Sequence, residues 1–220
     1  MKPWDRQKEV QKETLQVPDI HYIIDIAQTI PNERLKALYV LLYLTGARIC
    51  ELVRKRGCNL IPFPENKVTG KITKKYRYTK VLDDEKDKPS IRKKELTFQV
   101  MNEREVMVVW LRNEKNEKKD TKSVPIPLDN KEYAVLIGMI QEYISKLNME
   151  DELFPFGYQY AYRLLKPYFN PHWFRHIRAT HLTLNNDLSA PLLRKYMGWT
   201  DDRPSAHYQE MKIGDILDRL

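Results

Sequence analysis

Cationic side chains are concentrated in one short segment. Residues 171–182 read PHWFRHIRATHL and include three histidines and two arginines. On a helix, His172, Arg175 and Arg178 follow at intervals of three and therefore share one face, and His181 continues the row. Such a row favours a bound anion, and phosphate is the anion best matched by the planar guanidinium of arginine. A solvated helix face, or histidines hydrogen-bonded within the core, would give the same pattern.

Two further blocks carry residues of related chemistry. TGARICEL places Arg48 just after a helix break, with Glu51 three positions later. YMGWTDDRPSAHYQEM places Tyr208 nine positions after Trp199. Each block alone is a weak signal, whereas the three blocks in this order and spacing form a specific set.

The ordered set resembles the catalytic domain of the tyrosine recombinases, the phage-integrase family. That family has an arginine in a T-G-x-R-x-x-E/D-L setting, then H-x-x-R, then a G-H or G-W pair nine residues before a tyrosine. The resemblance covers about residues 17–215. The matching positions in this chain are Arg48, Glu51, His172, Arg175, Trp199 and Tyr208.

The resemblance implies that DNA strands are cut and rejoined through a 3′-phosphotyrosine intermediate. A free phenol has a pKa of about 10, so Tyr208 needs help to act as a nucleophile. His172 is placed to accept or share its proton. Arg48 and Arg175 would bind the non-bridging phosphate oxygens, where negative charge develops.

Other matched residues would support this chemistry. Trp199 would add its indole N–H as a donor while its ring packs. Glu51 would orient the first-block arginine or the histidine, with a plain surface salt bridge as the alternative. His176, His181 and His207 are expected to be structural.

The departing 5′ oxygen needs a proton, which the family supplies from a lysine on a β-hairpin ahead of a V-P-L strand. RNEKNEKKDTKSVPIPL occupies that place here. Lys115 is the expected donor because it closes the strand VVWLRNEK, and Lys118, Lys119 and Lys122 are alternatives. The long separation from the first block implies an insertion over residues 76–96, so a lysine of ITKKY is a further alternative.

The elements that must position these residues are mainly helical. From Asn32, the chain predicts a helix with Leu35, Leu38, Tyr39 and Leu42 on its apolar face, followed by a turn and a second helix. Alternating β-branched and aromatic residues over 65–127 predict a small antiparallel sheet, with 113–122 as a hairpin loop. Helical periods return in KEYAVLIGMIQEYISKL, YQYAYRLLKPYF, HWFRHIRATHLTL and APLLRKYMGW.

The expected fold class is therefore α+β and mainly α, and the resemblance specifies the helical catalytic domain of the DNA breaking-rejoining type. Residues 1–16 are expected to be a polar tail or linker and residues 17–220 the catalytic domain. The family's N-terminal core-binding domain is expected to be absent. Terminal residues 211–220 have apolar positions at helical spacing, for packing on a neighbouring protomer or on the chain's own domain.

Composition agrees with a polyanionic partner. The 220 residues carry a net charge of +8 and a pI near 9.3. Double-stranded DNA is the expected partner, with a homotetramer on DNA and a monomer or weak oligomer when free. Backbone contacts are expected from Lys71, Lys74, Lys75, Arg77, Arg163, Lys166, Arg194 and Lys195.

The sequence predicts neither a metal site nor a cofactor, since it has no H-E-x-x-H, no metal-spaced carboxylates and no G-K-[ST] loop. No apolar run is long enough to cross a bilayer, and the amino terminus lacks a secretory signal, so a cytoplasmic location without membrane contact is expected. Cys50 and Cys58 are expected to be reduced core residues.

The sequence therefore predicts a site-specific recombinase, a DNA strand transferase, most simply an integrase of a virus or plasmid, with an archaeal host as one candidate. A type IB topoisomerase shares the same catalytic set and is an alternative. A DNA-binding regulator that has kept the fold without the activity is another.

Overall fold

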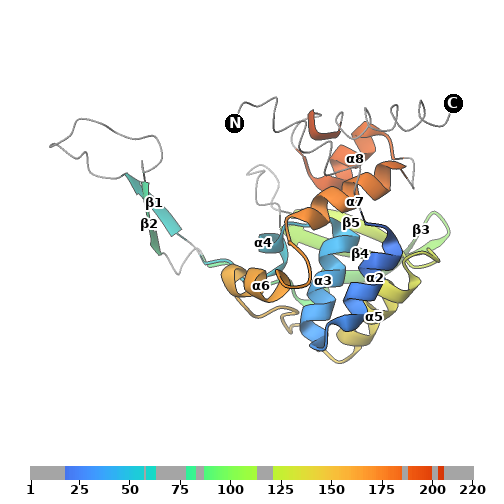
Figure 1. Ribbon diagram of the computed structural model, residues 1–220, viewed down its shortest axis with the longest axis horizontal. Coiled ribbons are helices and arrows are strands. Elements are labelled where there is room, and N and C mark those ends of the chain that lie inside the picture. The colour runs from blue at the N-terminus through green and yellow to red at the C-terminus, as the bar shows by residue number, and fades with distance from the viewer. Residues whose placement is uncertain are drawn as a thin grey trace.

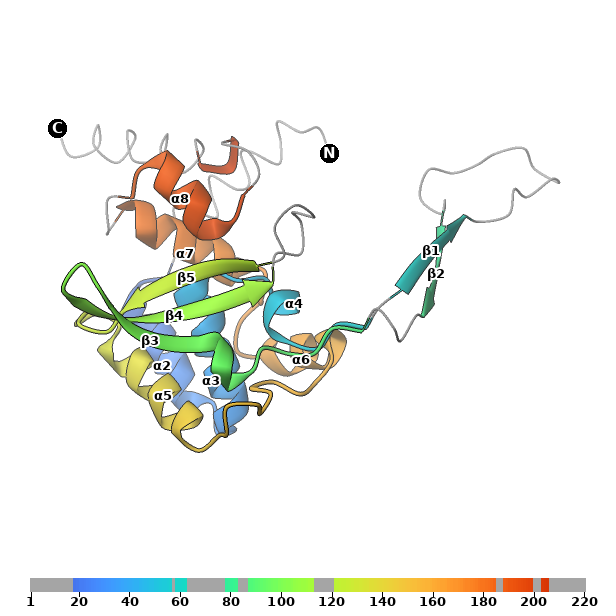
Figure 2. The same ribbon diagram turned by 180° about the vertical axis from the view of Figure 1, so that it is seen from behind.

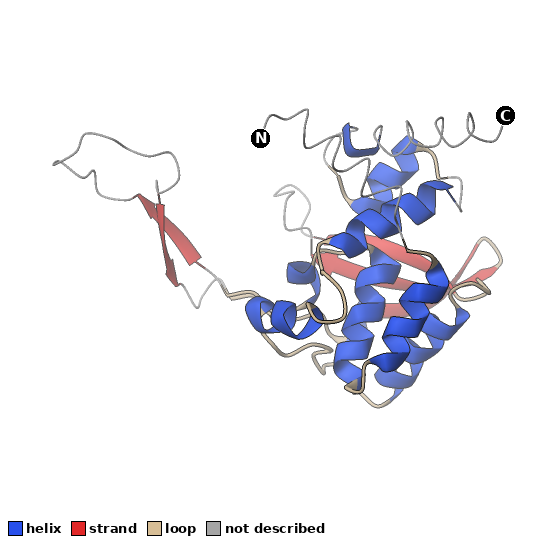
Figure 3. Cartoon of the chain, viewed as in Figure 1, coloured by secondary structure: helices blue, strands red, loops and turns tan. Residues whose placement is uncertain are grey.

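The computed structural model describes residues 18–56, 58–62, 78–82, 87–112, 121–184, 188–199 and 203–205. Helices α2 (Ile20–Thr29), α3 (Glu33–Thr45) and α5 (Ala134–Ser145) form a layer against one face of a three-stranded sheet (Figure 1). Seen from behind, the sheet lies in front of these helices (Figure 2). The architecture is α+β and mainly α, as the sequence predicts (Figure 3).

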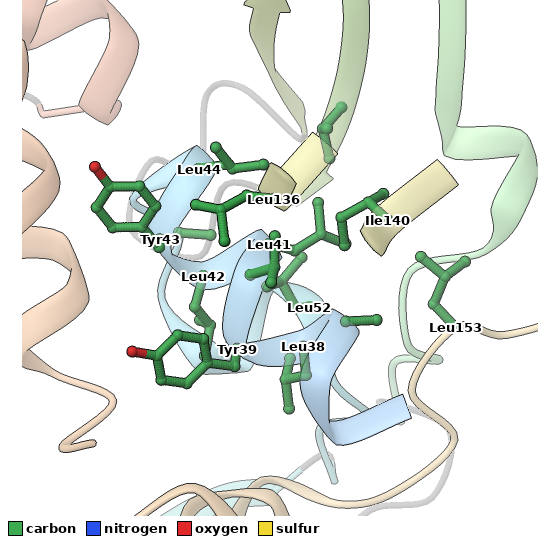
Figure 4. Close-up of a cluster of buried hydrophobic side chains, with 14 of the residues drawn as sticks. Leu38, Tyr39, Leu41, Leu42, Tyr43, Leu44, Leu52, Leu136, Ile140 and Leu153 are labelled. Carbon is green, nitrogen blue, oxygen red and sulfur yellow. The ribbon is translucent and has the colours of Figure 1, made fainter. Parts of the chain in front are cut away.

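Helix α3 is the centre of the core. Asn32 caps its start through a hydrogen bond of 2.9 Å from the Leu35 N–H, and every residue from Ala37 to Thr45 is buried. A helix that is apolar all round must be covered on all sides. Its leucines meet Leu136 and Ile140 of α5 in the cluster shown in Figure 4. The predicted core positions of this helix are confirmed, and the predicted single apolar face is wider than expected.

The sheet is an antiparallel meander of β3 (Leu96–Met101), β4 (Arg104–Arg112) and β5 (Thr121–Pro127), in the order β3-β4-β5. A turn at Asn102 and Glu103 joins β3 to β4, and both residues have positive φ, at 49° and 64°. Two such residues form the tight turn whose twist matches antiparallel strands. Buried side chains from β4 and β5, including Met107, Val109, Val124 and Ile126, face the helices.

Strands β1 (Cys58–Pro62) and β2 (Tyr78–Leu82) form a separate two-stranded antiparallel sheet. They extend away from the rest of the chain in both views (Figures 1 and 2). The expectation of one sheet over residues 65–127 is therefore wrong in this respect. Strand pairing is local between β1 and β2, and no ladder joins them to β3 among the described residues.

Helix α4 (Ile49–Leu52) follows α3 and contacts α6 (Tyr158–Leu165). Helix α7 (Trp173–Leu184) packs on α3 and on α8 (Ala190–Met197). A short 3₁₀ helix, Lys93–Glu95, leads into β3. Within the described ranges, no helix is long and apolar enough to cross a membrane.

Candidate active site

A sharp change of direction after α3 places Arg48. Gly46 ends α3 in the left-handed conformation, with φ of 58°, which glycine adopts without the usual steric cost. Arg48 then caps α4. Its main-chain N–H donates to Glu51 Oε2 at 2.9 Å and its guanidinium donates to Oε1 at 3.0 Å. Glu51 is therefore tied to the orientation of Arg48 at two points.

Glu51 is buried among cations. Its side chain is inaccessible to solvent, and Lys122 Nζ lies 2.8 Å from Oε2. The two groups form a buried ion pair. Burial raises the pKa of Glu51, but the charge of Lys122, the N–H of Arg48 and the charge of Arg175 outweigh this and lower it. The carboxylate is therefore held in its ionised form.

Lys122 belongs to the same buried cluster. It lies on β5 opposite Leu111, and its side chain is only 8% exposed. Burial lowers its pKa, Glu51 opposes this, and the positive charges of Arg175 and Arg48 lower it further. Three cations thus surround one carboxylate.

The other arginine of the motif pair reaches the same corner from α7. Arg175 Nη1 donates to the carbonyl of Gly46 at 2.8 Å, and Nη2 donates to the carbonyl of Met197 at the end of α8. Its guanidinium carbon lies 5.5 Å from the centre of the Trp199 ring, a cation–π distance. Arg175 therefore connects the end of α3, the end of α8 and Trp199.

A small cavity of about 120 Å³ lies between the start of α4, helix α6 and the start of α7. Arg48, His172 and Arg175 line it, together with Tyr158 and Tyr162 of α6. His172 is exposed and precedes α7, with its main-chain N–H bonded to Asn170 at 3.1 Å. The structure thus brings three residues of two distant sequence blocks to one cavity. The sequence suggested that His172 lies on the helix, whereas it lies just before α7.

The predicted cationic face of residues 171–182 is not formed. Arg178 and His181 point into the core. Arg178 lies 4.7 Å from the ring centre of Tyr133 and 5.6 Å from those of Tyr43 and Tyr196. His181 Nδ1 lies 2.8 Å from the Tyr43 hydroxyl. The cationic residues separate because α7, a helix of 12 residues, packs on α3. Its later turns therefore face the core.

A larger cleft of about 1200 Å³ adjoins the small cavity and shares Cys50 and Tyr158 with it. Its lining includes Lys55, Arg56 and Arg163. Cys50 is partly exposed there, so its expected place in the core is wrong. The side chain of Cys58 lies outside the part of the chain that is described.

The remaining predicted site residues are placed as follows. Arg163, Lys166 and Lys195 are exposed, and Arg194 is partly buried. Tyr208 and Lys115 lie outside the described residues, as do Lys118, Lys119, Lys71, Lys74, Lys75, Arg77 and His207. His176 packs edge-on against His172, with ring centres 5.6 Å apart. Over the described ranges, no group of His, Cys, Asp or Glu could hold a metal ion.

Two residues support the site in ways that the sequence did not predict. Arg112, at the end of β4, donates from Nη2 to the carbonyls of Cys50 and Val53 at 3.0 and 2.8 Å, and so holds the end of α4. Nothing in the sequence signals this bond. Lys122 lies on the same face of β5 as the buried Val124 and Ile126, because side chains two positions apart on a strand share a face. This spacing alone indicates an inward-facing lysine.

Comparison with known proteins gives the class of fold. No protein-family model and no curated protein matches this chain. The XerH site-specific recombinase bound to palindromic difH substrate, a post-cleavage complex, superposes with a TM-score of 0.50 at 12% identity, covering 91% of this chain and 50% of that one. XerH in a pre-cleavage complex with difH gives 0.49 at 13% identity, covering 86% and 48%.

The chain thus spans about half the length of the XerH structures that it resembles. Its fold is similar to that of the matched half of the XerH site-specific recombinase. At 12% sequence identity, the similarity is one of fold.

Proposed function

We propose that this protein is a site-specific DNA recombinase that cuts and rejoins strands through a phosphotyrosine intermediate. The observation that carries the proposal is the convergence of Arg48, His172 and Arg175 on one cavity, with Trp199 beside Arg175. Two guanidinium groups beside a histidine suit a phosphodiester that gains negative charge during substitution. The fold supports the same class of protein.

In the proposed reaction Tyr208 is the nucleophile. Its phenol proton passes to His172, the bond from the phenol oxygen to phosphorus forms, and the bond from phosphorus to the 5′ oxygen breaks. Lys115 gives a proton to the departing 5′ oxygen. Arg48 and Arg175 bind the non-bridging oxygens throughout. One phosphoester bond replaces another, so no bond energy is lost. A free 5′ hydroxyl can therefore reverse the reaction and rejoin a strand without a metal or a nucleotide.

DNA would lie across the exposed cations beside the cavity. Arg163 lines the adjoining cleft, and Lys166 and Lys195 are exposed. We assign to these residues, with Arg194 and the lysines and arginine between 71 and 77, a salt-dependent contact with phosphates. Four protomers on DNA, and an origin in a virus or plasmid, remain part of this proposal, as does a cytoplasmic site of action.

The test uses a pool of nicked DNA duplexes with a randomised central sequence, which release a short 5′ fragment after cutting. The wild-type protein is expected to form an adduct that survives denaturing electrophoresis, and Tyr208→Phe is expected to form none. Tyr22→Phe is the matched control, because Tyr22 is an exposed tyrosine of α2. An undiminished adduct with Tyr208→Phe would refute the proposal.

The same pool separates the alternative functions. Sequencing of trapped DNA should converge on one motif for a site-specific recombinase. Trapping without sequence preference, together with relaxation of a supercoiled plasmid, would instead identify a type IB topoisomerase. Salt-sensitive binding with no adduct from the wild-type protein would identify a regulator that binds DNA without cutting it.

A further inference from the structure

Lys122 has a place in the structure that the proposed reaction does not use. It comes from β5, not from the loop before it, and its ammonium points at Glu51. Glu51 Oε2 receives both this ammonium, at 2.8 Å, and the main-chain N–H of Arg48, at 2.9 Å. The other oxygen, Oε1, accepts from the Arg48 guanidinium at 3.0 Å. The three residues therefore form one chain of contacts that ends at the cavity.

The position of the ammonium is fixed by packing as well as by charge. A Cβ on Gly198 would lie 2.9 Å from Lys122 Cδ, so the lysine stem passes directly over the left-handed end of α8. The side chain is 8% exposed, against 21% for Arg48. A residue that donates a proton to a leaving group must reach bound DNA, whereas Lys122 is enclosed between β5, α4 and Gly198.

The charge balance explains why Glu51 needs this lysine. A buried carboxylate is costly unless it is paired. Arg48 must keep part of its guanidinium available to the cavity, so it cannot supply the whole compensation. Lys122 neutralises Glu51 within the buried cluster, and Glu51 can then hold the backbone and the guanidinium of Arg48 together.

We propose that Lys122 is a positioning residue, which fixes the ionised Glu51 so that Glu51 holds Arg48 in the orientation needed to bind phosphate. This inference rests on the proposed function, because it assigns Lys122 a role in the same site. It separates the role of Lys122 from that of the proton donor, which the proposed reaction assigns to Lys115.

The first test compares adduct formation by Lys122→Met on two nicked duplexes, one with the ordinary 5′ oxygen and one with sulfur in its place. A thiolate departs without a proton because a thiol has a pKa of about 8.5. If Lys122 positions Arg48, the variant is slowed about tenfold or more, and by the same factor on both duplexes. Recovery on the sulfur duplex would make Lys122 the proton donor and overturn the inference, as would an unchanged rate.

The second test asks whether Lys122 acts through Glu51. Adding Lys122→Met to Glu51→Gln should change the adduct rate by less than about twofold, because residues that act through one contact are not additive. Losses that multiply would overturn the inference. The double variant also guards against misfolding of the single one, since it removes both buried charges together.

A third measurement does not depend on activity. Phenylglyoxal modifies accessible arginines, and peptide mass spectrometry reads each site. Lys122→Met should raise modification of Arg48 several-fold and leave that of the exposed Arg163 unchanged. An unaltered Arg48 would overturn the inference. Absence of any adduct from the wild-type protein would end the proposed function instead, and the labelling result would still decide the place of Lys122.

Discussion

Arg175 donates a hydrogen bond of 2.8 Å to the carbonyl of Gly46, a residue 129 positions earlier in the chain. The second branch of the same guanidinium donates to Met197. One side chain thus fastens the end of α3 to the end of α8 while its flank packs on Trp199. The orientation of Arg175 therefore depends on the exact path of the backbone at Gly46 and Met197.

Gly46→Ala tests this dependence. The left-handed conformation costs a residue with a Cβ about 1–2 kcal/mol, and the new Cβ would lie 3.0 Å from the Met197 side chain and 3.3 Å from Arg178. We expect the free energy of unfolding to fall by at least the conformational cost, with adduct formation falling further because Arg175 loses its alignment. Urea titration and the trapping assay measure the two effects.

The control is Gly138→Ala, in the middle of α5, where a Cβ would meet nothing within 4 Å. This change should raise stability by about 0.5–1 kcal/mol. If Gly46→Ala is as harmless as Gly138→Ala, the turn does not constrain the site.

Tyr196→Phe should weaken the attachment of α8. The Tyr196 hydroxyl donates to the buried carbonyl of Leu44 at 2.6 Å and accepts from Arg178 Nη2 at 3.2 Å. Removing it leaves a buried acceptor without its donor, at a cost of about 1–3 kcal/mol. Thermal or urea unfolding gives the value, and Tyr22→Phe should change it by far less because Tyr22 is 51% exposed.

Stability should fall in acid because of His181. Burial and the charge of Arg178 lower its pKa from 6.5 to about 4, although its bond to the Pro18 carbonyl opposes the shift. Since that carbonyl only accepts, Nε2 carries the proton and Nδ1 accepts from Tyr43. The unfolded chain binds the extra proton below pH 6.5, so this contribution is full above pH 6.5 and is lost as the pH falls towards 4.

The loss should reach about 3 kcal/mol across that range. Urea titrations at several pH values measure the slope, and His181→Gln should flatten it. A slope that is equally steep in this variant would show that other groups are responsible.

DNA binding should depend on the exposed cations of the adjoining cleft. Arg163→Ala is expected to reduce the slope of log affinity against log salt by about one, in the way that loss of one phosphate contact does. Fluorescence anisotropy with a labelled duplex measures it. Lys146→Ala is the control, because Lys146 is exposed, pairs with Glu33 and lines neither cavity. Equal slopes for the two variants would remove Arg163 from the proposed contact surface.

The sequence predicted the helices better than the pairing of the strands. The spacing of Leu35, Leu38 and Leu42 was enough to find α3, because a buried helix repeats its apolar positions. The separation of β1 and β2 from the main sheet was missed, because alternation identifies a strand but not its partner.

The row of cations in residues 171–182 shows the same limit at the level of side chains. Spacing placed His172, Arg175 and Arg178 on one helical face. The helix begins only at Trp173, and Arg178 is enclosed by tyrosines from α3, from α8 and from the residue before α5. Aromatic faces can hold a buried guanidinium, and nothing near Arg178 in the chain announces them. The pairing of Lys122 with Glu51 could have been anticipated, since its strand neighbours at every second position are apolar.

The two hydrogen bonds that Arg175 donates also have a consequence for biosynthesis. The carbonyl of Met197 emerges from the ribosome long after that of Gly46, and until it does the guanidinium lacks one of its two anchors. A nascent or truncated chain ending before α8 would thus hold Arg175 loosely. Under the proposed function, the phosphate site would be complete only after α8 has folded, so an unfinished chain would cut DNA poorly.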